Sequence, residues 1–147
     1  MDVRIRGRQI LVQSLAMILL GLVWGLVVPH TPFPRLALGA HIQFVTNGML
    51  FALLALVLLS VPNNVGSRSA SIMLLAVCLT WVMAFTEVAN AWWGTNQVLP
   101  LAAQQAGAMG GTMLQETIVK LSHIGAGLVL IIAWALLLKG LLKEPTP

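Results

Sequence analysis

The chain has 147 residues, of which 59% are hydrophobic and only 8% are charged, whereas a typical soluble domain has about 25% charged residues. This composition excludes an ordinary soluble domain and indicates a membrane protein. The net charge of +4 comes without a basic stripe and interleaved aromatic residues, so nothing indicates nucleic-acid binding. The one cysteine, Cys78, excludes an internal disulfide, and we expect it to be a small buried hydrophobe.

Four apolar runs approach the length of about 20 residues that a bilayer requires. We expect a transmembrane helix in each of them, over residues 10–28, 36–61, 71–93 and 113–142. The first run follows basic residues, as a signal peptide would, but it is long and no A-x-A-like cleavage site follows, so we expect it to be retained. The sequence therefore predicts an all-α, integral membrane four-helix bundle that forms one domain, residues 1–147.

The last connection and the start of the fourth helix carry local signals. Residues 94–112 are long and almost uncharged for a connection, so we expect a lid or a re-entrant segment there. Thr112 and Gln115 have the spacing of a capping box. Glu116 and Lys120 have the spacing of an ion pair one helical turn apart.

Basic residues predict the orientation of the bundle. If the chain crosses four times, most of the Lys and Arg residues fall on one side: Arg4, Arg6, Arg8, Arg68, Lys139 and Lys143. The positive-inside rule then places both termini in the cytoplasm. We expect the protein in the bacterial inner (cytoplasmic) membrane.

This topology gathers polar residues from three helices in the outer half of the bilayer. His41 and Gln43 lie in the outer turns of the second helix, Glu87 and Asn90 in the last two turns of the third, and His123 near the outer end of the fourth. Intramembrane ionisable groups are costly, so such a layer indicates a functional site. The alternative is a structural network of hydrogen bonds between helices, and for Gln43 and Asn90 this alternative is at least as strong.

The surroundings of His41 suit two different partners. Gly39, Ala40 and Gly48 are small, and Phe44 lies about one turn away. A flat macrocycle liganded by His41 would need such a surface, but so would a close crossing with another helix. Asn47 lies roughly 120° around the helix from His41, so the two side chains would face different parts of a site, as in an oligomer with sites at subunit interfaces.

Two further signals have a structural explanation by default. The string GLVWG, residues 21–25, is a small-xxx-small motif that promotes close helix packing. Trp92 and Trp93 mark the outer membrane interface, where aromatic belts lie. They could also contact an aromatic ligand.

The string AHIQFVTNGML, residues 40–50, with His41 and then Asn47-Gly48-Met49, resembles the second-helix signature of the hydroxylaminobenzene mutase and styrene oxide isomerase family. The strings GLVWGLVVPHTPFPRLALGAH, residues 21–41, and EVANAWWGTNQ, residues 87–97, are similar to the mutase branch. The resemblance covers most of the chain and the four-helix plan.

The resemblance implies a redox-neutral membrane isomerase. In the styrene oxide branch the enzyme is a homotrimer that holds haem b at subunit interfaces, with the family histidine as axial ligand. Carried over, His41 becomes the iron ligand, with Phe44 and Gly48 beside the haem, and Asn47 becomes the amide that binds the substrate. The third-helix tyrosine of that branch has no counterpart, because this chain has no tyrosine. Its place falls near Trp93 or Gly94, and its absence favours the mutase branch.

The predicted reaction converts an arylhydroxylamine to an aminophenol within the membrane, with haem b as a Lewis acid. Asn47, Glu87 and Asn90 are the predicted catalytic residues, and Trp92, Trp93 and His123 are predicted to contact the small aromatic substrate together with Asn47. Membrane lipid is the other expected partner.

Three alternatives stay open at this stage. The same site could isomerise an aryl epoxide to an aldehyde. A non-catalytic haem-binding or electron-transfer subunit would use His41 and His123 as a bis-histidine pair. The third alternative is a metal-free scaffold or small transporter whose polar layer only packs.

Overall fold

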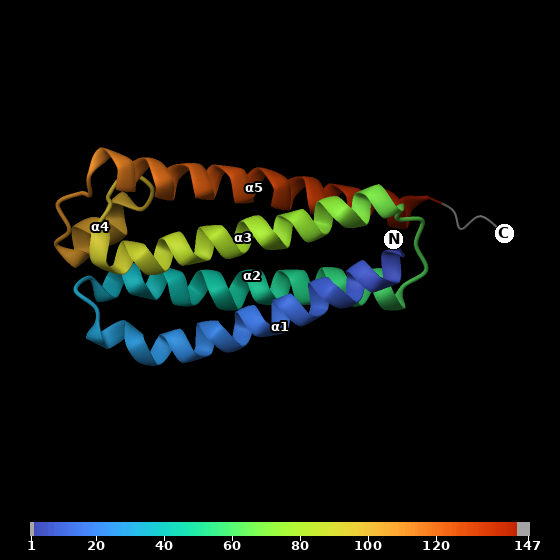
Figure 1. Cartoon of the computed structure of the whole chain (residues 1–147), viewed down its shortest axis with the longest axis horizontal. Coiled ribbons are helices and arrows are strands. Elements are labelled where there is room, and N and C mark those ends of the chain that lie inside the picture. Colours follow the sequence, from blue (N-terminus) through green and yellow to red (C-terminus); the bar gives the residue numbers. More distant parts are fainter. Residues whose placement is uncertain (1, 144–147) are drawn as a thin grey trace.

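The computed structural model describes residues 2–143, and over that range helices are the only regular structure (Figure 1). Four long helices follow one another: α1 (Val3–Val27), α2 (Pro34–Ser60), α3 (Ser67–Trp93) and α5 (Met113–Leu142). A 3-10 turn, η1 (Val28–His30), follows α1, and the short helix α4 (Pro100–Ala106) precedes α5. Each of the four long helices is long and apolar enough to cross a membrane. The predicted all-α plan with four such helices is confirmed.

The long helices alternate in direction, so the connections gather at two ends of the bundle (Figure 1). We call the end that holds the connections 28–33 and 94–112 the α4 end. The connection 61–66 lies at the opposite end, together with residues 2 and 143 (Figure 1). Which end faces the cytoplasm stays a prediction from the basic residues.

Local capping explains where the helices begin and end. α1 starts at Val3, before the expected residue 10, because the Asp2 side chain accepts a hydrogen bond from the backbone N–H of Arg4 at 3.1 Å. The capping box of Thr112 and Gln115 is present at the start of α5, as predicted. α3 ends at Gly94, whose φ of 64° is left-handed.

Glycines bring α1 and α2 into close contact. A Cβ built on Gly21 would lie 2.7 Å from the Cβ of Phe44, and one built on Gly48 would lie 2.9 Å from the backbone oxygen of Ser14. No larger residue fits at either position without a shift of the backbone. The close-packing role predicted for GLVWG is confirmed, and Gly48 serves the same helix crossing.

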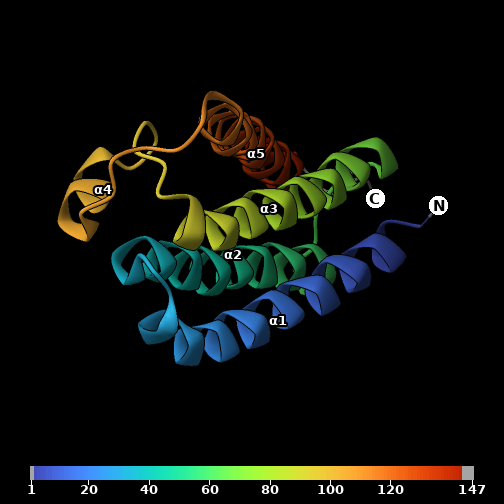
Figure 2. The same ribbon diagram turned by 60° about the vertical axis from the view of Figure 1, so that its left-hand side comes forward.

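The other helices form a chain of neighbours in which α2 packs on α3, and α3 packs on α5 (Figure 2). Buried side chains from all four helices form one core, and Ile10, Phe51, Met73 and Leu137 belong to it. α5 packs mainly on α3 and only slightly on α2. α1 also packs on α3, so α1, α2 and α3 form a group of three helices, and α5 lies at the edge of this group against α3.

Large apolar side chains cover the outward faces of the helices, as a bilayer requires. The expectation of a buried Cys78 is wrong, because this residue is exposed. It lies one turn from Leu75 and one turn from Val82, both exposed apolar residues on the same face of α3. Cys78 thus belongs to the outward face, where a thiol is compatible with lipid.

The connection 94–112 is held by a carboxylate. Glu116 accepts hydrogen bonds from the backbone N–H groups of Asn96 (2.9 Å), Gln97 (3.1 Å) and Gly111 (2.9 Å). Lys120 lies near enough to Glu116 for their charges to attract, as predicted, but the two side chains do not form a close ion pair among residues 2–143. The loop supplies three amide donors that need an acceptor, and charged hydrogen bonds of this kind are strong.

Candidate functional site

His41 projects from α2 toward α1 and is half-buried. Its Nδ1 lies 2.8 Å from the backbone oxygen of Gly21. A carbonyl can only accept, so Nδ1 carries the hydrogen and Nε2 keeps a free lone pair. Nε2 has no hydrogen-bond partner among residues 2–143, and it is not one of the fully buried polar atoms. A Cβ on Gly25 would lie 2.9 Å from Nδ1, so the imidazole packs directly on the second glycine of GLVWG, which we call the seat of His41.

This geometry fits one kind of metal centre and not another. Metal-binding histidines commonly donate their second ring N–H to a carbonyl, which fixes the tautomer and the ring orientation, and His41 has that arrangement. Within the described residues, no group of three or more His, Cys, Asp or Glu side chains could hold a bare ion. Haem brings its own equatorial nitrogens and needs only an axial side chain. His41 therefore fits an axial ligand of haem.

Glu87 and His123 form a buried pair across α3 and α5. Nε2 of His123 lies 3.0 Å from Oε1 of Glu87, and their side chains are 16% and 0% exposed. Nδ1 of His123 lies 2.8 Å from the backbone oxygen of Val119 on its own helix. The prediction that polar residues of the third and fourth helices meet at one depth is confirmed for this pair.

The second oxygen of Glu87 faces α2. Oε2 is buried and has no hydrogen-bond partner among the described residues. A Cβ built on Gly39 would lie 3.3 Å from Oε2 and 3.7 Å from Cδ1 of Leu99. Gly39 thus lies directly against the carboxyl group, and Leu99 from the connection 94–112 lies beside the same position of α2.

Gly39 and His41 lie on nearly opposite faces of α2. Gly39 lies against Glu87 of α3, whereas His41 bonds to Gly21 of α1. Residues two positions apart in a helix, such as Gly39 and His41, point about 200° apart around its axis, which agrees with these contacts. One protomer therefore keeps the free Nε2 of His41 away from the Glu87 pair. Both nitrogens of His123 also have close partners, so bis-histidine ligation by His41 and His123 of one protomer does not fit the structure.

Asn47 and Gln43 lie on the Gly39 side of α2, about 80° and 40° around the helix from Gly39. Nδ2 of Asn47 donates to Oε1 of Gln43 at 2.7 Å. Thr80 of α3 lies near the same level in the antiparallel register, and its buried hydroxyl has no partner among residues 2–143. The sequence interpretation missed Thr80; the available signal was a lone hydroxyl in the apolar run of the third helix.

Asn90 closes the C-terminal end of α3. Its Oδ1 accepts from the backbone N–H of Thr95 (2.8 Å) and from the Thr95 hydroxyl (2.7 Å). Both lone pairs of this oxygen are therefore used inside the protein. This geometry supports the structural alternative for Asn90 over the predicted catalytic role.

The remaining predicted site residues lie at other places. Phe44 is fully buried and packs edge-on against the rings of Trp81 and Phe85. Trp92 is 51% exposed and lies with its ring centroid 5.9 Å from that of Trp24, which suits an interfacial belt. Trp93 is half-buried. Their contacts to haem or substrate stay predictions.

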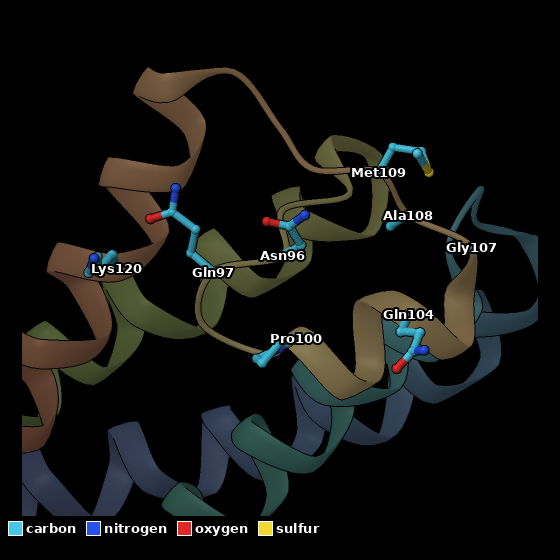
Figure 3. A pocket seen from close by; sticks show the side chains of 8 residues that line it. All are labelled: Asn96, Gln97, Pro100, Gln104, Gly107, Ala108, Met109 and Lys120. Atoms are coloured by element: carbon cyan, nitrogen blue, oxygen red, sulfur yellow. The ribbon is translucent and has the colours of Figure 1, made fainter.

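A cavity of about 740 Å³ opens at the α4 end, between α4, α5 and their connections (Figure 3). Side-chain amides of Asn96, Gln97 and Gln104 line it together with Lys120. None of the predicted site residues lines this cavity. Leu99, the N-cap residue of α4, lies beside Gly39 of α2, and its chain neighbour Pro100 lines the cavity.

The fold and the site together define a class: a helical membrane protein with an accessible imidazole nitrogen on α2 and a buried carboxyl–imidazole pair. The family described as styrene oxide isomerase matches residues 6–142, so the chain belongs to this family. It is 31% identical over 140 residues to hydroxylaminobenzene mutase HabB of Ectopseudomonas oleovorans, covering 95% of this chain and 83% of that protein. It is 30% identical over 108 residues to hydroxylaminobenzene mutase HabA of the same organism, covering 72% of this chain and 76% of that protein. No solved structure matches the chain.

These similarities confirm the predicted family and its mutase-like character. The names of the relatives indicate an isomerase or mutase, and the four apolar helices fit a membrane enzyme.

Proposed function

We propose that this protein converts an arylhydroxylamine, such as hydroxylaminobenzene, to an aminophenol by moving the hydroxyl group from nitrogen to the ring. The observation that carries the proposal is the Glu87–His123 pair, at 3.0 Å, buried in an otherwise apolar bundle. A redox-neutral rearrangement requires proton transfers but no nucleotide, and a buried carboxyl–imidazole pair provides groups for them. Both relatives are named hydroxylaminobenzene mutases, and the chain has no tyrosine.

His41 is the residue that would hold haem b, through the Nε2 atom that its bond to Gly21 leaves free. When bound, the iron supplies a Lewis acid that weakens the N–O bond of the substrate. Asn47 would bind the hydroxyl or amine of the substrate through its amide. The apolar helices exclude bulk water, which would otherwise capture the cationic intermediate.

We further propose that copies of the chain assemble, as the family resemblance implies for a homotrimer. The support is the arrangement on α2, where His41 and Gly39 point to different neighbours. A second copy could bring its His41 toward the Glu87 side of the first. The protein would act in the bacterial inner membrane on a small, lipid-soluble aromatic substrate.

The test is turnover by detergent-purified protein from haem-replete cells. We expect aminophenol from hydroxylaminobenzene without added nucleotide or reductant, and a ferric haem spectrum with one histidine ligand. The family description favours a second candidate, the isomerisation of styrene oxide to an aldehyde. Conversion of styrene oxide alone would select that candidate, and inactivity on both substrates would contradict the isomerase proposal.

A further inference from the structure

We propose that Glu87 and His123 act as one unit that holds a single proton, and that Oε2 of Glu87 carries a proton from the ring carbon of the substrate to its nitrogen. The inference rests on the proposed function and assigns the working atom within that site. It also changes the predicted role of His123 from substrate contact to positioning of the Glu87 carboxyl group.

The contacts of His123 indicate how many protons the pair holds. The backbone oxygen of Val119 can only accept, so Nδ1 of His123, at 2.8 Å, is a donor. Nε2 of His123 and Oε1 of Glu87 are 3.0 Å apart as an ion pair without the alignment of a hydrogen bond, and two unprotonated atoms would repel at that distance. One proton therefore lies between them, on the nitrogen or on the oxygen. In either arrangement the pair is neutral overall.

This neutrality explains how a carboxyl group is tolerated at this depth. Glu87 is fully buried, and an isolated carboxylate in a bilayer would be very costly. A partnered, overall neutral pair avoids most of that cost. The pair is the only ion pair among residues 2–143.

Oε2 has the properties of an atom that awaits a ligand. It is buried, no described residue offers it a hydrogen bond, and, unlike Oε1, it has no contact with His123. Buried polar atoms are normally satisfied, so an orphaned one requires an explanation. The neighbouring position on α2 is Gly39, where even a Cβ would come within 3.3 Å of Oε2. Position 39 therefore carries no side chain that would cover this oxygen, and we place a polar group of the substrate there.

The chemistry of the rearrangement needs one such atom. After the hydroxyl moves to the ring, the intermediate is an imine whose ring carbon bears both hydrogen and hydroxyl. The C–H bond then breaks, its electron pair restores the aromatic ring, and the C=N electron pair moves to nitrogen, which takes a proton. One proton leaves carbon and one proton reaches nitrogen. A carboxylate oxygen that accepts the first and delivers it to the second balances the step without any co-reactant, while His123 keeps its contact with Oε1.

The neighbouring residues offer a matched control. Thr86 and Ser122 immediately precede the two members of the pair, and their hydroxyl oxygens are 2.7 Å apart across the same two helices. Thr86→Val removes this polar bridge but leaves the proton-holding pair intact. A merely structural role for the pair predicts that both bridges have similar effects.

The experiment compares wild type, Glu87→Gln, His123→Gln and Thr86→Val on ordinary and ring-deuterated hydroxylaminobenzene, after their thermal stability has been measured. We expect Glu87→Gln to lower kcat by about 100-fold or more, as general acid–base catalysis typically contributes. It should also acquire a ring-deuterium isotope effect, because C–H cleavage becomes rate-limiting. His123→Gln should have a kcat between those of wild type and Glu87→Gln, and its kcat should change more than its KM. Thr86→Val should match wild type in both kcat and the isotope effect.

Gly39→Ala provides a second route if Glu87→Gln is unstable. It leaves both members of the pair in place and fills the space beside Oε2, so it should reproduce the lower kcat and the isotope effect. Active wild type with unchanged kcat in Glu87→Gln and Gly39→Ala would overturn this assignment alone. Wild type that forms no aminophenol would overturn the proposed function first, and the assignment with it.

Discussion

The contact of His41 with Gly25 predicts how much the substitution Gly25→Ala should destabilise the protein. In Gly25→Ala, the new Cβ would lie 2.9 Å from Nδ1 and 3.1 Å from Cε1 of His41, closer than the 3.4–4 Å of ordinary contact. The imidazole must move by several tenths of an ångström, which strains its 2.8 Å bond to the Gly21 backbone oxygen. The substitution therefore tests whether glycine at this position orients the ring.

The expected change in stability is the difference between opposing effects. Overpacking costs about 1–3 kcal/mol, and a lost hydrogen bond costs about 1 kcal/mol. Replacing a glycine within a helix by alanine stabilises the helix by about 0.5–1 kcal/mol. Gly25→Ala should then destabilise the protein by about 1–3 kcal/mol. Gly127→Ala is the matched control, because a Cβ there meets no atom within 4 Å, and it should be neutral or stabilising.

The assay measures the thermal unfolding midpoint in detergent and the haem retained per protein. We expect Gly25→Ala to lower both relative to wild type, whereas Gly127→Ala should lower neither. Equal midpoints and equal haem content for the two variants would refute the seat assigned to His41. If Gly25→Ala loses stability but keeps its full haem content, only the role of His41 as the haem ligand would be refuted.

Other substitutions extend this account. His41→Ala should lose haem and activity together, which an absorption spectrum and turnover check; full retention of both would exclude it as the ligand. Asn47→Ala should keep haem but lower kcat, so an unchanged rate would remove it from the site. Glu116→Gln should destabilise the protein by about 1–3 kcal/mol and speed proteolysis within residues 94–112. Proteolysis as slow as in wild type would contradict the role of Glu116 in holding this connection. Gly48→Ala should weaken the α1–α2 packing, because its Cβ would lie 2.9 Å from the Ser14 backbone oxygen, and an unaltered unfolding midpoint would count against that contact.

The sequence predicted the helices well because each apolar run is long and ends at a proline, a glycine or a polar turn. It also predicted the meeting of Glu87 and His123, since helix direction alone places both near one end of the bundle. The Gly21–Gly25 motif was recognised as a packing signal. Its second role, as the seat of His41, depends on which face of α1 meets α2, and composition does not encode that rotation.

The errors have a similar origin. The i,i+4 spacing predicted the charge attraction of Glu116 and Lys120 but not the hydrogen-bond partners of Glu116, which are amides of a loop that folds back. The catalytic role of Asn90 stays a prediction, and the bonds from Thr95 to its side-chain oxygen could not be predicted because they depend on how the chain turns after α3. Cys78 was expected inside because free cysteines usually are, yet in a membrane bundle the outward face is also apolar.

The most direct test of the central claim is the product formed from hydroxylaminobenzene by the purified protein in water labelled with heavy oxygen. The account predicts aminophenol that keeps the unlabelled oxygen of the substrate, since the hydroxyl moves within one molecule in a site closed to bulk water. No aminophenol, or aminophenol that carries the label of the solvent, would contradict it.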